Sequence, residues 1–173
     1  MKRFLAALLV LGAVLGSVAF AEERVAEERG CIAAATRIEE KLKCIRGLTF
    51  KEVQDDNTPM GARQFEMKFT QLVDNANPSL GTFTQWLVLI HRNENEPMVL
   101  QTSGYSIFSV KEATTTALFG TNQIQVEHRF FSDSKPAQLD WSKLDIKQSA
   151  DDFHQITLAF KQIYGKKWLN TGG

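Results

Sequence analysis

The chain is poor in cysteine, proline, tyrosine and histidine, and it has no excess of either charge. Its 173 residues include 2 cysteines, 4 prolines, 2 tyrosines and 3 histidines, and 20 basic residues balance 20 acidic ones. A neutral chain lacks the attraction that draws basic proteins to nucleic acids and anionic lipids, so neither is expected as a partner. His91, His128 and His154 lack the spacing of metal ligands, so no metal site is expected.

Hydrophobic residues, in contrast, are abundant. They make up 43% of the chain, and 12 of them are phenylalanines. Such a composition supports a packed core and argues against disorder. About 150 residues remain after the N-terminal segment described next, and that length suffices for one domain with a real core.

The first 21 residues have the features of a signal peptide. A positively charged start at residues 1–3 precedes an apolar run over residues 4–18, and Ala-Phe-Ala at residues 19–21 matches an A-x-A cleavage site. We predict cleavage after Ala21 and export, so that the mature protein is secreted or periplasmic and keeps no lasting membrane contact. The alternative is a membrane anchor, but the apolar run is short for a span of about 20 residues.

The mature chain is expected to begin with a loose leader over residues 22–32, followed by a domain over residues 33–173. Its two cysteines are Cys31 and Cys44, and export into an oxidising compartment favours a disulfide. The residues between them have helical spacing, however, and a continuous helix would hold the two Cα atoms about 20 Å apart. A disulfide needs about 7 Å or less. Pairing therefore requires a helix that begins after Cys31, and the sequence leaves this question open.

Hydrophobic periodicity and turn residues predict the secondary structure of the domain. Apolar residues alternate in some segments, run continuously in others and recur with helical spacing in the rest. Gly47 and Gly120 are placed to end two helices, and Asp140 or Ser142 is placed to cap the start of the last helix. The predicted helices span residues 35–45, 111–119 and 142–164, and the predicted strands span residues 48–53, 65–69, 86–90, 98–100, 124–126 and 168–169.

The order of these elements indicates a mixed α/β fold. Antiparallel strands joined by turns come first, and strands alternate with helices from residue 98 onward. Alternation of this kind implies right-handed parallel crossovers with helices on both faces of the sheet. In such sheets ligands bind beyond the carboxyl ends of the parallel strands, which here are the loops after Leu100, Val126 and Leu169.

The last residues of the sequence match part of a nucleophile turn. In many hydrolases a strand enters a tight turn of the form G-x-S-x-G, whose serine is the nucleophile. Gly172 and Gly173 follow the last predicted strand and fit the first two positions, so the next residue of the parent reading frame is expected to be the serine. In this interpretation the chain is truncated at the nucleophile elbow, and no catalytic residue is present in it. The alternative is an ordinary glycine-rich tail.

The loop after residue 100 is the candidate for part of an oxyanion hole. In hydrolases of this architecture one backbone N–H donor comes from this loop, and the other comes from the residue after the nucleophile. Gly104 would let the backbone approach a substrate closely, and the N–H of Tyr105 is the predicted donor. The alternative is an ordinary turn.

The loop after residue 126 begins with Glu127, a carboxylate near the expected cleft. We predict that Glu127 holds the free amino end of a substrate. The alternative is a structural segment, in which Arg129 pairs with a carboxylate and Phe130 and Phe131 pack against their neighbours.

Segments spread over residues 36–173 carry a family resemblance, and it lies in their order and spacing. The segments are residues 38–42 (IEEKL), 47–49 (GLT), 77–78 (NP), 81–83 (GTF) with Gln85, 89–92 (LIHR), 102–105 (TSGY), 126–131 (VEHRFF), 140–144 (DWSKL) and 171–173 (TGG). Together they resemble the secreted bacterial serine tripeptidyl aminopeptidases, distant relatives of the prolyl carboxypeptidase and dipeptidyl peptidase group.

This resemblance implies the N-terminal part of an α/β-hydrolase fold, and a whole enzyme that releases short peptides, expected to be tripeptides, from free N-termini. Peptides are then the partners, and no metal or organic cofactor is implied. In the whole enzyme the serine would attack the scissile carbonyl, a histidine would move the proton and backbone N–H groups near Tyr105 would hold the oxyanion.

The chain departs from the family pattern at two positions and in length. The family tends to have a basic residue where Trp86 stands and a histidine where Asn75 stands. It also continues with the serine, a helical lid and the acidic and histidine members of the triad. None of these lies within the 173 residues, so this piece alone is expected to be inactive.

Two other functions stay open from the sequence. The first is a non-catalytic exported α/β domain that holds peptides near Tyr105 and residues 130–131 without cleaving them. The second is a hydrolase with a different leaving group, such as an esterase.

Overall fold

The computed structural model describes residues 22–54 and 56–172. The predicted signal peptide, with its cleavage after Ala21, therefore lies outside the described residues. The chain divides into two compact units, residues 1–46 and residues 47–173, and each is described by itself. Over the described residues, no helix combines the length and the apolar character needed to cross a bilayer.

The described part of the first unit is helical. Residues 22–34 form one helix and α2 (Ile38–Cys44) forms another. Alanine, glutamate and arginine are strong helix formers, which explains why residues 22–34 are helical. The leader over residues 22–32 stays a prediction. The two helices are separate because the Glu40 carboxylate accepts hydrogen bonds from the backbone N–H groups of Thr36 (3.3 Å) and Arg37 (3.2 Å), and α2 begins directly after them.

The break between these helices brings the two cysteines together. Cys31 and Cys44 form a disulfide, and their Cα atoms lie 5.7 Å apart. The helix that carries Cys44 begins at Ile38, after Cys31, which is the condition that pairing required. The predicted helix over residues 35–45 is thus shorter, and the open question of the disulfide is decided in favour of pairing.

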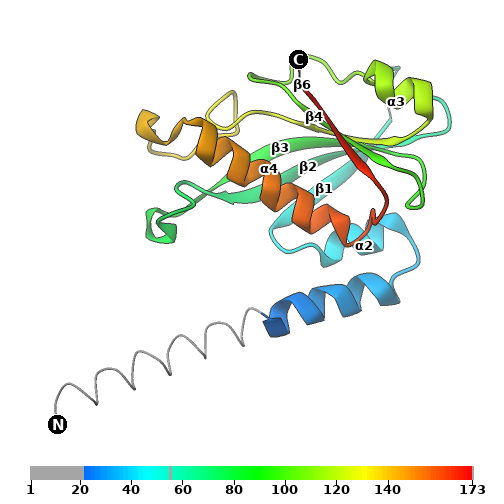
Figure 1. The fold of residues 1–173 in the computed structure, drawn as a ribbon, viewed down its shortest axis with the longest axis horizontal. Helices are drawn as coiled ribbons and strands as arrows, with labels where there is room; N and C mark the ends of the chain where they lie inside the picture. Colours follow the sequence, from blue (N-terminus) through cyan, green and yellow to red (C-terminus); the bar gives the residue numbers. More distant parts are fainter. Residues whose placement is uncertain (1–21, 55, 173) are drawn as a thin grey trace, which may run out of the picture. The chain divides into compact units, whose positions relative to one another are not determined.

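The second unit is built on one six-stranded sheet of order β1-β2-β3-β5-β4-β6 (Figure 1). The first three strands are antiparallel neighbours, and β3 also pairs antiparallel with β5. From β4 onward the pairing is parallel, between β4 and β5 and between β4 and β6. The predicted change from antiparallel to parallel pairing is confirmed. The strands are β1 (Leu48–Val53), β2 (Arg63–Leu72), β3 (Thr82–His91), β4 (Met98–Thr102), β5 (Asn122–Val126) and β6 (Trp168–Gly172).

The two connections between parallel strands lie on opposite faces of this sheet. The β2–β3 and β3–β5 registers place Gln71 and Ile124 on one face, and Gln123 on the other, since neighbouring residues of a strand alternate. Gln71 donates to the Asp152 carbonyl of α4 (Ile146–Lys161), which crosses the sheet in Figure 1. Gln123 instead donates to the Lys111 carbonyl, in the segment that leads into α3 (Thr114–Phe119).

Both helices are shorter than predicted, and side-chain hydrogen bonds explain why. The side chain of Gln123 binds the Lys111 carbonyl (2.9 Å) and the Ala113 N–H (2.8 Å), which holds residues 111–113 outside the helix. At the other end, Gly120 takes the left-handed conformation at φ 61° and ends α3 as predicted. For α4, Asp145 is the cap, whereas Asp140 caps a separate 3₁₀ turn, η2 (Trp141–Lys143).

The core of this unit lies between the sheet and α4. The sheet contributes alternate residues of β2, β3 and β5 to one face, and α4 contributes its apolar stripe. Complete burial of a large apolar side chain contributes about 1.5–3 kcal/mol. The apolar side chains with 0% exposure on this face of the sheet and on α4 are Phe65, Leu87, Leu89, Ile124, Val126, Ile156 and Phe160.

Candidate active site

The three parallel strands end at one edge of the sheet. Thr102 at the end of β4 is paired with Val126 at the end of β5 and with Gly172 at the end of β6. The loop of residues 103–113, here called the β4 loop, and the loop of residues 127–145, called the β5 loop, therefore begin side by side. Gly172 is the last described residue of the same row, and Gly173, the second predicted elbow residue, lies outside the described residues.

The β4 loop exposes its backbone at Tyr105. The Tyr105 side chain is 65% exposed, and within the described residues its N–H has no hydrogen-bond acceptor. Its carbonyl is held in place, since it accepts from the His128 N–H (3.1 Å) and from the Ser103 hydroxyl (3.0 Å). A fixed carbonyl fixes the peptide plane that follows it, so this part of the loop has a defined orientation.

The two glycines predicted at this edge have room for larger residues. A Cβ atom built at Gly104 or Gly172 meets no heavy atom within 4 Å, and neither residue has a positive φ. The described structure therefore does not itself require glycine at these positions. Their predicted roles, close approach to a substrate and entry to the elbow, stay predictions.

Glu127, the first residue of the β5 loop, connects the two loops by hydrogen bonds. It is 1% exposed. One carboxylate oxygen accepts from the Ile107 N–H of the β4 loop (3.3 Å), and the other accepts from the Ser134 hydroxyl (2.6 Å). Both oxygens are thus bound within the chain. The prediction that Glu127 holds a substrate's amino group is not tested by this arrangement, which does show a second task for the same carboxylate.

Arg129 fixes the β5 loop to the rest of the unit. It is 1% exposed and forms a bidentate pair with Asp152 of α4, at 2.7 and 2.9 Å. Its remaining N–H groups donate to the carbonyls of Leu72 (3.0 Å), Val73 (3.2 Å) and Lys143 (2.8 Å). The structural alternative for Arg129 is thereby observed: it pairs with a carboxylate.

The turn that follows Arg129 has an uncommon backbone. Phe130 has φ 70° and Ser132 has φ 42°, values that residues with a Cβ adopt at some energetic cost. Hydrogen bonds between Phe130 N–H and Ser134 carbonyl, and between Ser134 N–H and Phe131 carbonyl, hold the turn. The Phe131 ring packs edge-on against Tyr105, with 5.5 Å between ring centroids. The turn therefore also supports the β4 loop.

Asp74, two residues after β2, binds the far part of the β5 loop. It pairs with Lys143 at 2.8 Å, and it accepts from the Ala76 N–H and from the Gln148 side chain. The Lys143 ammonium first, and these two donors next, lower the pKa of Asp74 from 3.8 to about 2. The carboxylate is therefore charged at all but strongly acidic pH.

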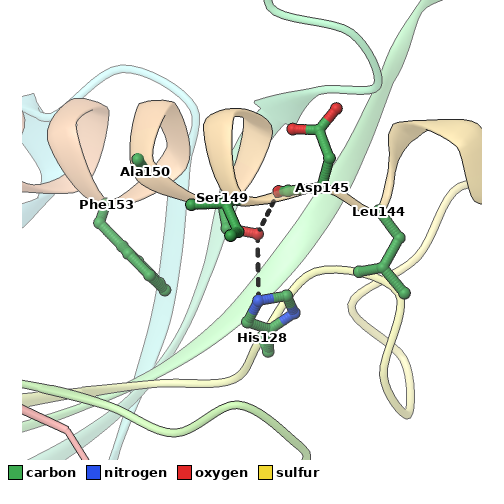
Figure 2. Close-up of a pocket in the computed structure, with 7 residues that line it drawn as sticks. His128, Leu144, Asp145, Ser149, Ala150 and Phe153 are labelled. Atoms are coloured by element: carbon green, nitrogen blue, oxygen red, sulfur yellow. Dashed lines mark hydrogen bonds between the residues drawn. The ribbon is translucent and has the colours of Figure 1, made fainter.

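A pocket opens where the β5 loop meets the start of α4. It has a volume of about 420 Å³. Figure 2 shows His128 between Phe153 and Leu144, with Ser149 above it. The Ser149 hydroxyl lies 3.0 Å from Nε2 of His128 and 2.9 Å from the Asp145 carbonyl, and Nδ1 of His128 lies 3.0 Å from the Arg129 carbonyl. The pocket is lined by His128, Leu144, Asp145, Ile146, Ser149, Ala150 and Phe153.

The Ser149–His128 pair was missed by sequence reasoning. The two residues are 21 positions apart and match no local motif, so only the fold brings them together. Ser149 is 7% exposed and lies within a helix, bonded to the carbonyl four residues before it. A nucleophilic serine needs an exposed hydroxyl beside oxyanion donors, and this setting instead makes the pair part of a pocket wall.

The other two histidines lie away from this edge. His91 has its Nδ1 2.9 Å from the buried Tyr164 hydroxyl, whose pKa is raised by burial, and His154 is exposed on α4. Within the described ranges, no three His, Cys, Asp or Glu side chains gather as they would around a metal ion.

Comparison with known proteins identifies the family. The family model described as PS-10 peptidase S37 matches residues 32–173. The chain belongs to this peptidase family. It is also 37% identical to the prolyl tri/tetrapeptidyl aminopeptidase of Streptomyces mobaraensis over 174 aligned residues, which cover 100% of this chain and 36% of that protein. The chain thus spans about a third of the length of this relative, and the family predicted from the sequence is confirmed.

Two acetyl xylan esterases of known structure resemble this chain weakly. The acetyl xylan esterase 1 of a Thermoanaerobacterium species matches with a TM-score of 0.40 at 13% identity, over 83% of this chain and 44% of the esterase. The acetyl xylan esterase of a Paenibacillus species matches with a TM-score of 0.41 at 8% identity, over 84% of this chain and 49% of the esterase. The S37 assignment rests on the sequence matches alone.

Proposed function

We propose that the whole protein to which this chain belongs is an exported serine aminopeptidase that releases tripeptides from free N-termini, so that three residues precede the cleaved bond. The observation that carries the proposal is the 37% identity to a tri/tetrapeptidyl aminopeptidase over the full length of this chain, together with the S37 family match. The described residues would form the substrate-facing edge of an α/β-hydrolase sheet.

The geometry of the edge supports this role. In α/β-hydrolases the nucleophile follows a strand, and a backbone N–H from a neighbouring strand's loop binds the oxyanion. Here β6 and β4 are neighbours whose last residues, Gly172 and Thr102, are in register. A serine placed soon after Gly172 would therefore lie near the Tyr105 N–H, which has no acceptor within the described residues.

The proposed mechanism assigns separate tasks to the two loops. The Tyr105 N–H stabilises negative charge on the carbonyl oxygen as the serine attacks, and the N–H after the serine is the second donor. A histidine elsewhere in the whole protein accepts the serine proton and returns it to the leaving amine. The β5 loop holds the β4 loop in place through Glu127 and His128.

Export is supported by two features of the first unit. The sequence of residues 1–21 has the composition of a cleaved signal. The Cys31–Cys44 disulfide belongs to the kind of bond that persists in oxidising compartments outside the cytoplasm.

The experiment is labelling of the whole protein with a fluorophosphonate, followed by peptide mapping. The expected result is one labelled serine located after Gly173, in the sequence Gly-Gly-Ser-x-Gly, and loss of labelling when that serine is replaced by alanine. Cleavage of tripeptidyl p-nitroanilides, with acetyl esters as the competing substrates, then distinguishes a peptidase from an esterase.

Two results would contradict the proposal. Absence of any labelled serine, with peptides bound but uncleaved, would favour the non-catalytic peptide-binding domain. Label on Ser149 would instead identify the Ser149–His128 pair as the nucleophile and its base.

A further inference from the structure

The pocket at the start of α4 has no role in the proposed chemistry. We propose that it binds the apolar side chain of the substrate's N-terminal residue, the third residue before the cleaved bond. This inference rests on the proposed aminopeptidase function, and it assigns specificity to side chains of this chain that lie outside the oxyanion edge.

The lining of the pocket selects for apolar groups. Leu144, Ile146, Ala150 and Phe153 contribute aliphatic and aromatic surface, and Ile146 is 90% exposed. Such exposed apolar surface around a concave site is typical of ligand pockets.

The polar groups of the pocket are already bound to one another. The His128 ring spans the Arg129 carbonyl and the Ser149 hydroxyl, and that hydroxyl also meets the Asp145 carbonyl. The Asp145 carboxylate accepts from the Gln148 N–H (2.8 Å) as the cap of α4, and Figure 2 shows it pointing away from His128. A polar side chain entering the pocket would lose its water without gaining free partners, which disfavours it.

The pocket is connected to the oxyanion edge through His128. Its backbone N–H binds the Tyr105 carbonyl, directly beside the predicted donor. Its ring packs edge-on against Phe131, at 5.7 Å between centroids, and Phe131 packs in the same way against Tyr105. One continuous set of contacts therefore leads from Tyr105, the residue that carries the predicted donor, to the pocket wall.

The separation fits a substrate of three residues. The pocket begins two residues after β5, whereas the nucleophile would follow β6, and β4 lies between these strands. Two interstrand spacings amount to about 10 Å. Three extended residues span roughly 10 Å as well. A peptide whose third carbonyl carbon lies at a serine after β6 would thus place its first residue beyond the end of β5, where the pocket begins.

The wall of the pocket is rigid enough to discriminate between side chains. Arg129, next to His128, is held by five hydrogen bonds, two of them to Asp152. The Phe153 ring on α4 packs edge-on against His128 at 6.3 Å. Apolar pockets of fixed shape discriminate by roughly 10- to 200-fold for each methylene that fits or fails to fit.

The experiment measures kcat/KM of the whole protein on X-Ala-Pro-p-nitroanilides with leucine or glycine at X. The wild type is expected to prefer leucine by about 10- to 100-fold, as burial of a leucine side chain predicts. Ala150→Phe fills the pocket and is expected to remove most of this preference, measured as the ratio of kcat/KM for the leucine substrate to kcat/KM for the glycine substrate. Gln155→Phe, which adds the same ring at an exposed position of α4, is the matched control and is expected to keep the preference.

A second variant works in the opposite direction. Leu144→Ala enlarges the pocket, so the preference is expected to shift toward tryptophan at X. It keeps the inference testable if Ala150→Phe does not fold. Equal leucine preference in wild type, Ala150→Phe and Leu144→Ala would overturn the inference. An equal fall for the leucine and glycine substrates in Ala150→Phe, which would leave the preference unchanged, would also overturn it.

Failure of the proposed function is recognised separately. In that case no p-nitroanilide is cleaved and no serine is labelled, and the pocket is tested by calorimetric binding of Leu-Ala-Pro amide to the whole protein. Weaker binding to Ala150→Phe than to Gln155→Phe would support the pocket without the chemistry. Equal binding to both would overturn it.

Discussion

The β4 loop and the β5 loop leave the same edge of the sheet but are built in opposite ways. In the β4 loop Tyr105 is 65% exposed and Phe108 is 89% exposed, and the Tyr105 N–H has no acceptor within the described residues. In the β5 loop Glu127 and Arg129 are each 1% exposed. Both oxygens of the Glu127 carboxylate accept hydrogen bonds, and the Arg129 guanidinium donates to Asp152. Because Glu127 binds the Ile107 N–H, the buried residues at the start of the β5 loop help to define where the β4 loop presents its backbone.

The largest expected effect comes from breaking the buried pair of the β5 loop. Asp152→Ala leaves the Arg129 guanidinium buried without its carboxylate, and removal of one partner of a buried pair costs about 3–5 kcal/mol. We expect a loss of this size in the free energy of unfolding, measured by urea denaturation. The neighbouring Asp151→Ala is the control, because Asp151 forms an exposed pair with Lys147 that is worth about 0.3–0.5 kcal/mol. Similar losses in both variants would contradict a stabilising role of the buried Arg129–Asp152 pair.

The next effect tests the exposed loop. Tyr105→Pro removes the backbone N–H that is proposed to bind the oxyanion, and loss of one such donor lowers kcat by about 10²–10³-fold. Tyr105→Phe keeps the N–H and the ring, so its kcat on a tripeptidyl p-nitroanilide is expected to stay close to that of the wild type. If Tyr105→Pro retains full activity while folding normally, the Tyr105 N–H is not the donor.

The smallest effect concerns the acid limit of the β5 loop. Since the pKa of Asp74 is lowered from 3.8 to about 2, mainly by Lys143, its contribution to stability is complete above about pH 4 and is lost as pH falls toward 2. The melting temperature measured from pH 6 to pH 2 should therefore fall less steeply over this window in Asp74→Asn. Asp133→Asn, at an exposed position of the same loop, is expected to follow the wild-type curve. Identical slopes in all three proteins would show that Asp74 does not carry this dependence.

The strands were predictable because their signals are local. Alternation at Phe65, Met67 and Phe69 predicted β2, and Gly120 marked the end of α3 through the one backbone conformation that glycine favours. The predicted starts of α3 and α4 were less accurate. For α3, the side chain of Gln123 in β5 binds the residues before the helix. For α4, Asp140 caps a separate 3₁₀ turn and Asp145 caps the helix itself.

The candidate site was predictable as an edge but not as a network. The order of strands and helices already implied that the loops after Leu100, Val126 and Leu169 lie at one edge of the sheet, and in the structure the first of these loops begins after Thr102. The carboxylate that pairs with Arg129 belongs to Asp152, which is 23 residues away along the chain. The Ser149–His128 pair forms because α4 lies against the β5 loop. Such contacts have no signal in a single sequence, because they arise from packing between elements distant along the chain.

The placement of β4 between β5 and β6 has a consequence for the order of assembly. Met98 pairs with Asn122 of β5, 24 positions later, and with Trp168 of β6, 70 positions later. The entropy of closing the longer loop makes the second pairing about 1 kcal/mol less favourable to initiate than the first. We therefore expect β4 to pair with β5 before it pairs with β6 during folding.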